Sequence, residues 1–340
     1  MRSDPFPAVS LVDLPDHHER RVTFSAMGTQ CEIVIVGGPD LRTLGVDMVA
    51  DQERRWSRFL PDSDISRANR SSGQPVLVHW TTRDLLMLAK EGWVRTAGRF
   101  DPTVGASMEA LGYDRSFEQV EFASKNSGVA VAPGCDDVIV DVVGCTVTVP
   151  IGTRLDVGGI AKGRTGDLVA SALMDAGARG ACVNIGGDVV VTGEPATGES
   201  WVVELANPNF PGGTIGSVRL RDAAIAMSSR TIRKWDAADS FGNPTAVHHL
   251  VDPTTGAPTS TDVVAAAVIS GAGWWSDVLT KALATHQTSG SLELLRNVGA
   301  GAHGLVVDAQ GRMHFDEGFS TFLVDGFVDA VIESERTNVR

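Results

Sequence analysis

Residues 154–167 read Arg-Leu-Asp-Val-Gly-Gly-Ile-Ala-Lys-Gly-Arg-Thr-Gly-Asp, and the interpretation of the whole chain starts from this stretch. An apolar run ends at Leu155, and a carboxylate, two glycines and a lysine follow it. Apolar residues from Leu168 to Leu173 then recur on one helical face, and Gly177 is suited to the end of that helix. The stretch therefore predicts a strand-like segment that turns sharply into a helix.

Glycines at the start of a helix favour an anionic ligand. Backbone N–H groups are exposed there, and the helix dipole favours negative charge. Lys162 adds a compact positive charge suited to phosphate. The stretch is neither a Walker P-loop, because Lys162 precedes Gly163, nor a G-x-G-x-x-G motif. A tight strand-to-helix turn without a ligand is the alternative that these residues alone leave open.

The segment Asp-Val-Gly-Gly-Ile-Ala-Lys-Gly at 156–163 resembles the central motif of the ApbE family, the FAD:protein FMN transferases. Further segments resemble the family's motifs in the same order: Ser-Ala-Met-Gly-Thr at 25–29, Ser-Asp-Ile-Ser-Arg-Ala-Asn at 63–69, Gly-Arg-Phe-Asp-Pro-Thr-Val-Gly at 98–105, Asn-Ile-Gly-Gly-Asp at 184–188, His-His-Leu-Val-Asp-Pro-Thr-Thr-Gly at 248–256 and Ser-Asp-Val-Leu-Thr-Lys-Ala at 276–282. Several blocks in a fixed order are far more specific than any one of them, and they extend over most of the chain.

The resemblance implies an α+β fold with mixed or antiparallel sheets flanked by helices, in two packed lobes with the flavin between them. Because the motifs interleave along the chain, we expect one catalytic unit over residues 21–334. Residues 1–20 would form a loose arm and residues 335–340 a tail. Periodicity predicts helices at 41–59, 82–97, 273–285 and 324–334, and strands at 21–36, 129–131, 138–140, 146–149, 201–206, 215–220 and 264–270.

Composition limits the class of partner. The net charge is −13, which disfavours general affinity for nucleic acid or anionic membranes. Only five of the 29 basic residues are lysines, and Lys162 and Lys281 both lie in the motifs. The four cysteines form no C-x-x-C pair, so we expect free thiols rather than a metal or redox site.

The N-terminal residues suggest a location. Residues 1–19 contain no basic and apolar leader and no lipobox-like cysteine, and no apolar run approaches the roughly 18 residues of a membrane span. We therefore expect a cytoplasmic protein without a membrane span, although members of the family are often exported.

The resemblance also implies a set of site residues. FAD would be the substrate, Mg²⁺ would assist, and His249 would be the catalytic base. The metal would be held by the carbonyl of Gly159 and by Asp277 and Thr280. The residues expected to bind FAD are Met27, Phe59, Arg99, Phe100, Asp101, Asp156, Lys162, Val251 and Lys281.

One departure from the family pattern bears on the metal. The family has a threonine four residues after the metal-binding aspartate, whereas this chain has Lys281 four residues after Asp277. Thr280 lies one position early, about 100° round the helix. Either Asp277 and Thr280 hold Mg²⁺ with a shifted geometry, which is our expectation, or the Lys281 ammonium pairs with Asp277 and weakens or replaces the metal.

The activity implied by the resemblance is transfer of FMN from FAD to a serine or threonine hydroxyl of an acceptor protein, with release of AMP. The acceptor would carry a Ser/Thr-containing flavinylation motif. Two alternatives remain open: hydrolysis of FAD to FMN and AMP, or FAD binding without turnover. Met227 and Ser229 replace a threonine and a glycine of the family pattern, and with Lys281 they motivate these alternatives.

Overall fold

The computed structural model describes residues 18–120, 130–210, 212–238, 243–298 and 301–324. Most of the expected N-terminal arm, the C-terminal tail, and nearly all of the helix expected at 324–334 lie outside these residues, as does the first residue of the strand expected at 129–131. None of the helices in the described ranges is both long and apolar enough to cross a bilayer.

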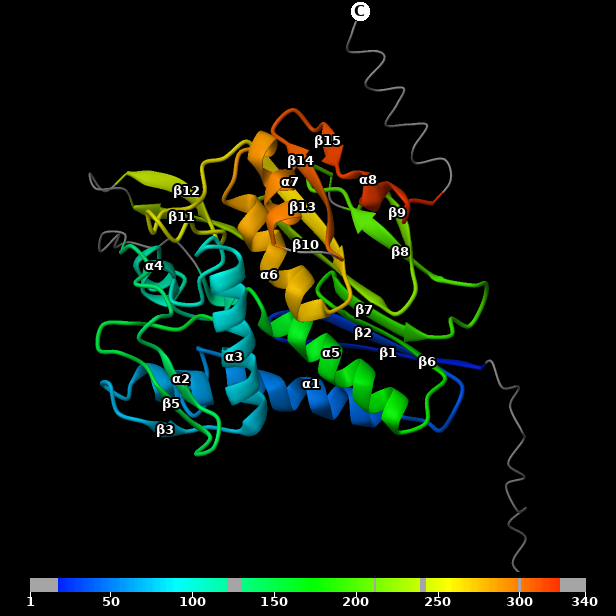
Figure 1. The fold of residues 1–340 in the computed structure, drawn as a ribbon, viewed down its shortest axis with the longest axis horizontal. Coiled ribbons are helices and arrows are strands. Elements are labelled where there is room, and N and C mark those ends of the chain that lie inside the picture. Colours follow the sequence, from blue (N-terminus) through cyan, green and yellow to red (C-terminus); the bar gives the residue numbers. More distant parts are fainter. Residues whose placement is uncertain (1–17, 121–129, 211, 239–242, 299–300, 325–340) are drawn as a thin grey trace, which may run out of the picture.

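A large antiparallel sheet forms the centre of the described structure (Figure 1). Its strands, in spatial order, are β1 (Glu19–Ala26), β2 (Thr29–Val36), β6 (Gly180–Ile185), β7 (Asp188–Gly193), β10 (Ala223–Ser229), β13 (Val263–Ser270), β14 (His303–Asp308) and β15 (Met313–Phe315). Each neighbouring pair is antiparallel. All eight residues of β13 are buried, because this central strand is covered on both faces.

Smaller strand groups and helices surround this sheet. The groups are β3 (Val76–Leu77), β5 (Thr146–Thr148) and β4 (Ile139–Asp141); β8 (Trp201–Ala206) and β9 (Thr214–Leu220); and β11 (Lys234–Ala238) and β12 (Pro244–His248). The helices are α1 (Arg42–Trp56), α2 (Asp64–Asn69), α3 (Trp80–Arg95), α4 (Gly105–Ala110), α5 (Ala161–Asp175), α6 (Gly273–Ala284), α7 (Thr288–Asn297), α8 (Glu317–Ser320) and the 3₁₀ turn Phe117–Gln119.

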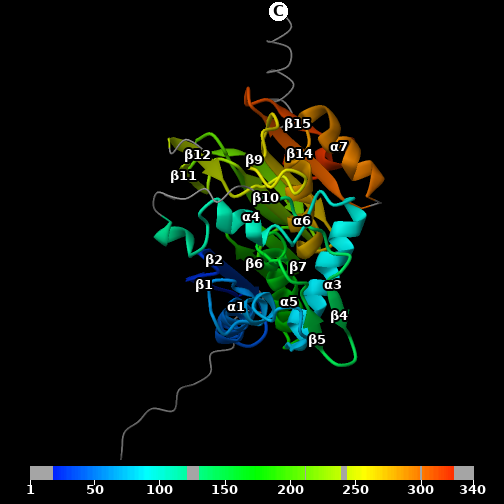
Figure 2. The same cartoon turned by 90° about the vertical axis from the view of Figure 1, so that its left-hand side faces the viewer.

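Alternation along the strands divides the core into two layers. On β2, Ile33 and Ile35 face α1 and α5, whereas Val34 and Val36 face the β8–β9 pair. Helices α5 and α6 pack on the same face of the sheet as α1 (Figure 2). The expected α+β class, with antiparallel sheets flanked by helices, is confirmed.

The expectation of one continuous strand over residues 21–36 is wrong. The segment forms the hairpin β1–β2, and Met27 and Gly28 make its turn with positive φ angles of 53° and 64°. A two-residue turn with positive φ at both positions matches the twist of a hairpin. Methionine is uncommon in that conformation, so the sequence gives no sign of a turn at Met27. The alternating pattern therefore predicted a single strand.

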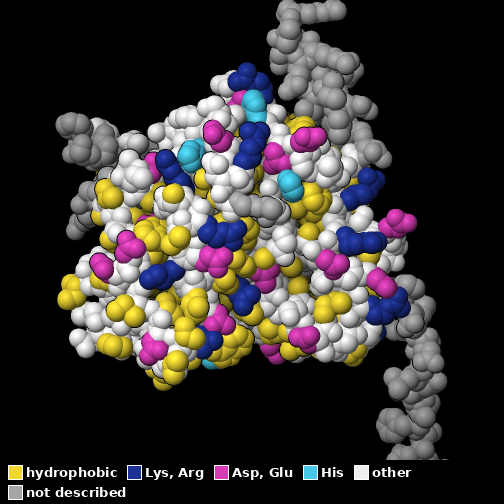
Figure 3. All heavy atoms as spheres, viewed as in Figure 1, with side chains coloured by type: hydrophobic (Ala, Val, Ile, Leu, Met, Phe, Trp, Pro, Cys, Tyr) yellow, Lys and Arg dark blue, Asp and Glu magenta, His cyan; other side chains and the backbone are white. Residues whose placement is uncertain are grey.

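The acidic side chains do not form one large patch on the face shown in Figure 3. Basic and acidic side chains are interspersed there. Exposed apolar side chains at Leu77, Ile139 and Val143 belong to the small sheet of β3, β4 and β5 or to its connecting turn. The local charge of a binding site therefore has to be judged from the residues that line it.

Candidate active site

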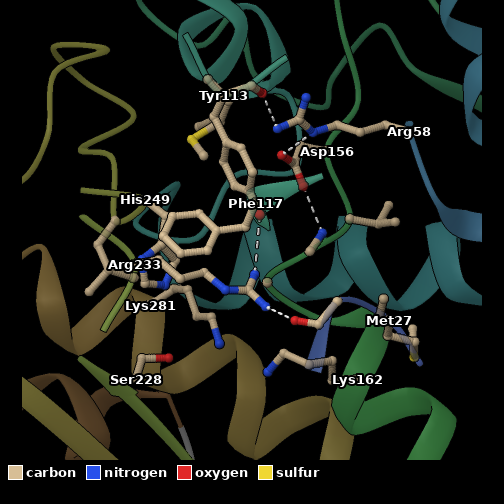
Figure 4. A pocket seen from close by; sticks show the side chains of 18 of the residues that line it. Met27, Arg58, Tyr113, Phe117, Asp156, Lys162, Ser228, Arg233, His249 and Lys281 are labelled. Atoms are coloured by element: carbon tan, nitrogen blue, oxygen red, sulfur yellow. Dashed lines mark hydrogen bonds and ion pairs between the residues drawn. The ribbon is translucent and has the colours of Figure 1, made fainter. Parts of the chain in front are cut away.

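A cavity of about 280 Å³ opens beside the N-terminal end of α5 (Figure 4). Its walls come from distant parts of the chain: the β1–β2 turn, the loop after α1, the start of α5, β10 and α6. The volume is near the lower end for small-molecule sites, which is roughly 300–1,000 Å³. The cavity exists only because these segments pack together.

Aromatic rings form one wall of the cavity. The ring centroids of Phe59 and Tyr113 lie 5.5 Å apart, and those of Tyr113 and Phe117 lie 6.0 Å apart in an edge-on arrangement. The Arg58 guanidinium lies 4.3 Å from the Phe59 ring centroid. Such a wall offers flat, polarisable surface to a planar ring system.

Asp156 fixes the entry to the α5 turn. Its Oδ1 accepts a hydrogen bond from the Gly158 N–H at 2.7 Å, and its Oδ2 accepts one from Arg58 Nε at 2.8 Å. Arg58 also donates to the carbonyl of Tyr113 at 2.5 Å. Asp156 therefore joins the glycine turn to the aromatic wall, and it lines the cavity as expected.

The segment Arg99-Phe100-Asp101 also lines the cavity. Asp101 Oδ1 accepts hydrogen bonds from the backbone N–H and the hydroxyl of Thr103, at 2.8 and 2.6 Å. Burial raises the pKa of Asp101, and the Thr103 hydrogen bonds only partly offset that rise. Phe100 lies against Gly159, where an added Cβ would come within 3.1 Å of its ring.

Lysines and carboxylates alternate at the floor of the cavity. Lys162, on the first turn of α5, pairs with Asp188 at the start of β7. Lys281 on α6 pairs with Asp277 one turn earlier. Figure 4 shows both lysine side chains ending in the cavity. Asp188 is therefore buried in an ion pair.

The crossing of α5 and α6 explains why glycine follows Lys162. A Cβ at Gly163 would lie 2.1 Å from the carbonyl oxygen of Gly273. The Gly163 N–H donates to Asp277 Oδ2 at 3.2 Å. Close contact of the two helices thus aligns the lysine of one with the carboxylate of the other.

Two of the three expected magnesium ligands, Asp277 and Thr280, are engaged by the protein itself. Asp277 Oδ2 accepts from Gly163, and Asp277 Oδ1 faces the Lys281 ammonium. Thr280 Oγ1 lies 2.8 Å from both Ser228 Oγ and the carbonyl of Asp277. Mg²⁺ requires near-octahedral oxygen donors at about 2.0–2.1 Å. With an ammonium between the carboxylate and the hydroxyl, this arrangement does not fit Mg²⁺.

His249 lines the cavity beside Arg233. Its backbone N–H donates to the carbonyl of Arg233 at 3.4 Å, and its Nδ1 is buried without a hydrogen-bond partner among the described residues. Burial lowers the pKa of His249 well below its ordinary value, and the charges of Arg233 and Lys281 lower it further. The imidazole is therefore neutral at neutral pH, as a proton acceptor must be.

The cavity brings together most of the predicted site residues. Those that line it are Met27, Phe59, Arg99, Phe100, Asp101, Asp156, Gly159, Lys162, His249, Val251 and Lys281. Asp277 and Thr280 lie behind this lining and are completely buried. Their contribution to the cavity is through Lys281, which contacts both of them.

Several residues of the cavity were not foreseen from the sequence. Arg233 crosses the cavity and donates hydrogen bonds to the Tyr113 hydroxyl at 3.3 Å and to the Gly28 carbonyl at 3.1 Å. Arg58, Phe117 and Ser228 also line it. Two of these had a signal in the sequence, because Arg58 directly precedes Phe59 and Ser228 lies between Met227 and Ser229. Arg233 lies outside every motif.

The lining carries an excess of positive charge within an acidic protein. Its basic residues are Arg58, Arg99, Lys162, Arg233 and Lys281, and its acidic residues are Glu53, Asp101 and Asp156. Lining of this sign attracts an anion, and the aromatic wall attracts a flat ring. A ligand with both features, such as a flavin bearing phosphates, suits the cavity.

Known proteins with a similar sequence are flavin transferases. The model of the ApbE family matches residues 27–306. The FAD:protein FMN transferase of Rhodobacter capsulatus is 30% identical over 272 residues, which cover 77% of this chain and 50% of that protein. This chain thus spans half the length of that relative. The enzyme of the same name from Treponema pallidum is 27% identical over 269 residues, covering 73% of this chain and 72% of that protein.

Solved structures agree with this assignment. The crystal structure of the ApbE protein from Thermotoga maritima superposes with a TM-score of 0.78 at 25% identity, covering 91% of this chain and all of that one. The flavin transferase ApbE from Vibrio cholerae gives a TM-score of 0.71 at 22% identity, covering 90% of this chain and 99% of that one, and supports the fold alone. Because the ApbE family model matches residues 27–306, which are most of this chain, the chain belongs to the ApbE family.

Proposed function

We propose that this protein transfers the FMN part of FAD to a hydroxyl group of an acceptor protein and releases AMP. The observation that carries the proposal is one cavity with an aromatic wall, two lysine ammonium groups at its floor and a neutral histidine beside them. Relatives over most of the chain are named FAD:protein FMN transferase.

The chemistry needs positioning and charge neutralisation more than covalent catalysis. An acceptor hydroxyl oxygen forms a bond to the phosphorus on the FMN side of the FAD diphosphate. The bond from that phosphorus to the bridging oxygen breaks, and the oxygen leaves with AMP. His249 accepts the hydroxyl proton, and Lys162 and Lys281 stabilise charge on the phosphate oxygens.

The aromatic wall would hold the isoalloxazine ring. Phe59 offers a stacking face but no hydroxyl, and Met27, at the hairpin turn, also lines the cavity. Asp156 would act by holding Arg58 and the glycine turn rather than by chemistry. The Mg²⁺ predicted from the family resemblance is not part of this proposal, because two of its expected ligands are engaged by the protein: Asp277 by Lys281 and Gly163, and Thr280 by Ser228.

The test is mass spectrometry of an acceptor peptide that contains a Ser/Thr flavinylation motif, incubated with FAD and the purified protein. The expected result is a peptide that gains the mass of FMN less water, together with one equivalent of AMP. The matched control is the same peptide with alanine at the acceptor position. Free FMN and AMP with an unmodified peptide would show hydrolysis instead, and intact bound FAD would show a binding protein.

A further inference from the structure

Four charged side chains form a compact cluster at the cavity floor: Lys162, Asp188, Asp277 and Lys281. The carboxylate side chains are 1% and 0% exposed, whereas the lysine side chains are 17% and 18% exposed. The acids therefore lie behind the lysines, and the ammonium groups face the cavity. A ligand that enters meets two positive charges and neither carboxylate.

The protein fixes the Lys281 ammonium from several sides. It faces Asp277 Oδ1 and lies 3.2 Å from Thr280 Oγ1. Asp277 is itself held by the Gly163 N–H, and Thr280 by the Ser228 hydroxyl. The lysine stem passes Gly159, where an added Cβ would be in contact with Lys281 Cγ at 3.4 Å. A charge held in this way needs little reorganisation when an anion arrives.

The cluster also has one polar atom without a partner. Asp188 Oδ1 is buried and accepts no hydrogen bond from any described residue, although Asp188 Oδ2 is paired with Lys162. Asp277, in contrast, has a partner for each oxygen: the Lys281 ammonium at Oδ1 and the Gly163 N–H at Oδ2. This paired carboxylate holds Lys281 in place.

We propose that Lys281 serves as a built-in cation for the substrate's diphosphate, so that this protein binds and uses FAD without a divalent metal. The inference rests on the proposed function for its substrate. What it adds is the position of the Lys281 ammonium, which contacts Asp277 Oδ1 and Thr280 Oγ1. These are the side-chain oxygens that the family resemblance assigns to the metal. With Lys162 it presents two ammonium groups to the diphosphate, each paired with a buried carboxylate behind it.

The first experiment uses the wild-type protein freed of metal with a chelator. FAD binding is followed by flavin fluorescence, and FMN transfer by peptide mass, with excess chelator and with millimolar Mg²⁺. We expect the FAD dissociation constant and the transfer rate to differ by less than about twofold between the two conditions, well below the effect of losing one charged hydrogen bond. A metal dependence of about tenfold or more in binding would overturn the proposal.

The second experiment exchanges the lysine. Lys281→Met keeps the stem and removes the charge, so metal-free FAD binding should weaken by at least about tenfold. Lys281→Thr frees the Asp277 carboxylate and adds a hydroxyl, so Mg²⁺ should now strengthen FAD binding and raise the melting temperature. Lys234→Met, an exposed lysine on β11, is the matched control and should behave as wild type. If both Lys281 variants bind FAD like wild type without metal, the proposal fails.

The two readouts separate this inference from the function. Metal-free, Lys281-dependent FAD binding without any transfer would sink the transferase and leave the built-in cation intact. Transfer that requires Mg²⁺ would support the transferase and exclude Lys281 as a substitute for the metal. If neither Lys281 variant folds, the wild-type comparison with and without chelator still decides.

Discussion

Gly163 of α5 and Gly273 of α6 lie backbone against backbone, so that a Cβ on Gly163 would stand 2.1 Å from the Gly273 carbonyl oxygen. The contact sets the distance between Lys162 and Asp277, which belong to different helices. Backbone atoms cannot yield as a flexible side chain can, so any larger residue must push the helices apart.

Gly163→Ala should therefore lower the free energy of unfolding by about 1–3 kcal/mol, as overpacking does. It should also weaken FAD binding, because Lys162 and Asp277 move apart. Chemical denaturation and an FAD titration measure the two effects. Gly271→Ala is the control, since a Cβ there meets nothing within 4 Å. Equal stability of the two variants would contradict the importance of the contact.

We expect the activity to depend on pH through His249. Burial, Arg233 and Lys281 hold the pKa of His249 well below its ordinary value of about 6.5. A base works in its neutral form, which is present above its pKa and lost as pH falls through it. The kcat/KM for FAD should thus stay level on acidification from neutral pH to about 6.5 and fall only at lower pH.

His249→Gln should lower kcat/KM by about 10²–10⁴ and remove this acidic limb. His248→Gln is the matched control, because His248 is not among the residues that line the cavity, and its Nε2 lies 3.2 Å from the Thr259 carbonyl. It should retain the limb. An acidic limb in wild type with its midpoint above 6.5 would contradict the assignment.

Asp188 should support the charge of Lys162. Burial opposes that charge, but Asp188 and Asp277 outweigh it and raise the pKa of Lys162. Asp188→Asn keeps the shape and removes the nearer carboxylate, so stability should fall by about 1–3 kcal/mol, less than for a fully enclosed pair because the lysine side chain is 17% exposed.

The same variant should show a distinct pH dependence. A lysine with a lowered pKa loses its proton as pH rises, so FAD binding by Asp188→Asn should weaken at alkaline pH sooner than binding by wild type. Titrations of FAD across pH measure this. Asp47→Asn, an exposed position on α1, should bind FAD as wild type does. Identical alkaline profiles for Asp188→Asn and wild type would exclude the supporting role.

Arg233 should slow the escape of bound FAD. It joins the β1–β2 turn to Tyr113 across the cavity through hydrogen bonds to Gly28 and to the tyrosine hydroxyl. Arg233→Lys keeps the charge and loses the planar, two-sided donor, so FAD should dissociate about 3- to 30-fold faster at a nearly unchanged association rate. Stopped-flow fluorescence measures both rates, and unchanged dissociation would refute this role.

The sequence predicted elements where one local signal dominated. The short helix α2 begins after Ser63, a residue type that favours a helix start, and the Ser63 hydroxyl accepts a hydrogen bond from the Ser66 N–H. Helix α6 begins at Gly273, and strand β8 covers the expected residues 201–206. The start of α2 follows from capping and the extent of β8 from alternation, both of which act over a few residues.

What the sequence did not reveal depends on contacts between distant residues. Lys162 and Asp188 are 26 positions apart, and nothing local shows that a strand start will meet a helix start. Arg233 and Gly28 are separated by 205 positions. The ordered motifs predicted most of the cavity lining, yet they could not show that Lys281 would engage the oxygens expected to hold a metal.

The cavity's dispersed origin has a consequence for biosynthesis. Its walls run from Met27 to Lys281, and β2 pairs with β6 some 150 positions away. Long-range antiparallel pairing is slow, because the chain loses the entropy of loop closure before the stabilising contacts between the strands form. A chain still on the ribosome therefore has no flavin site until α6 has emerged, and FAD bound afterwards connects segments from Met27 to Lys281 and stabilises the folded chain.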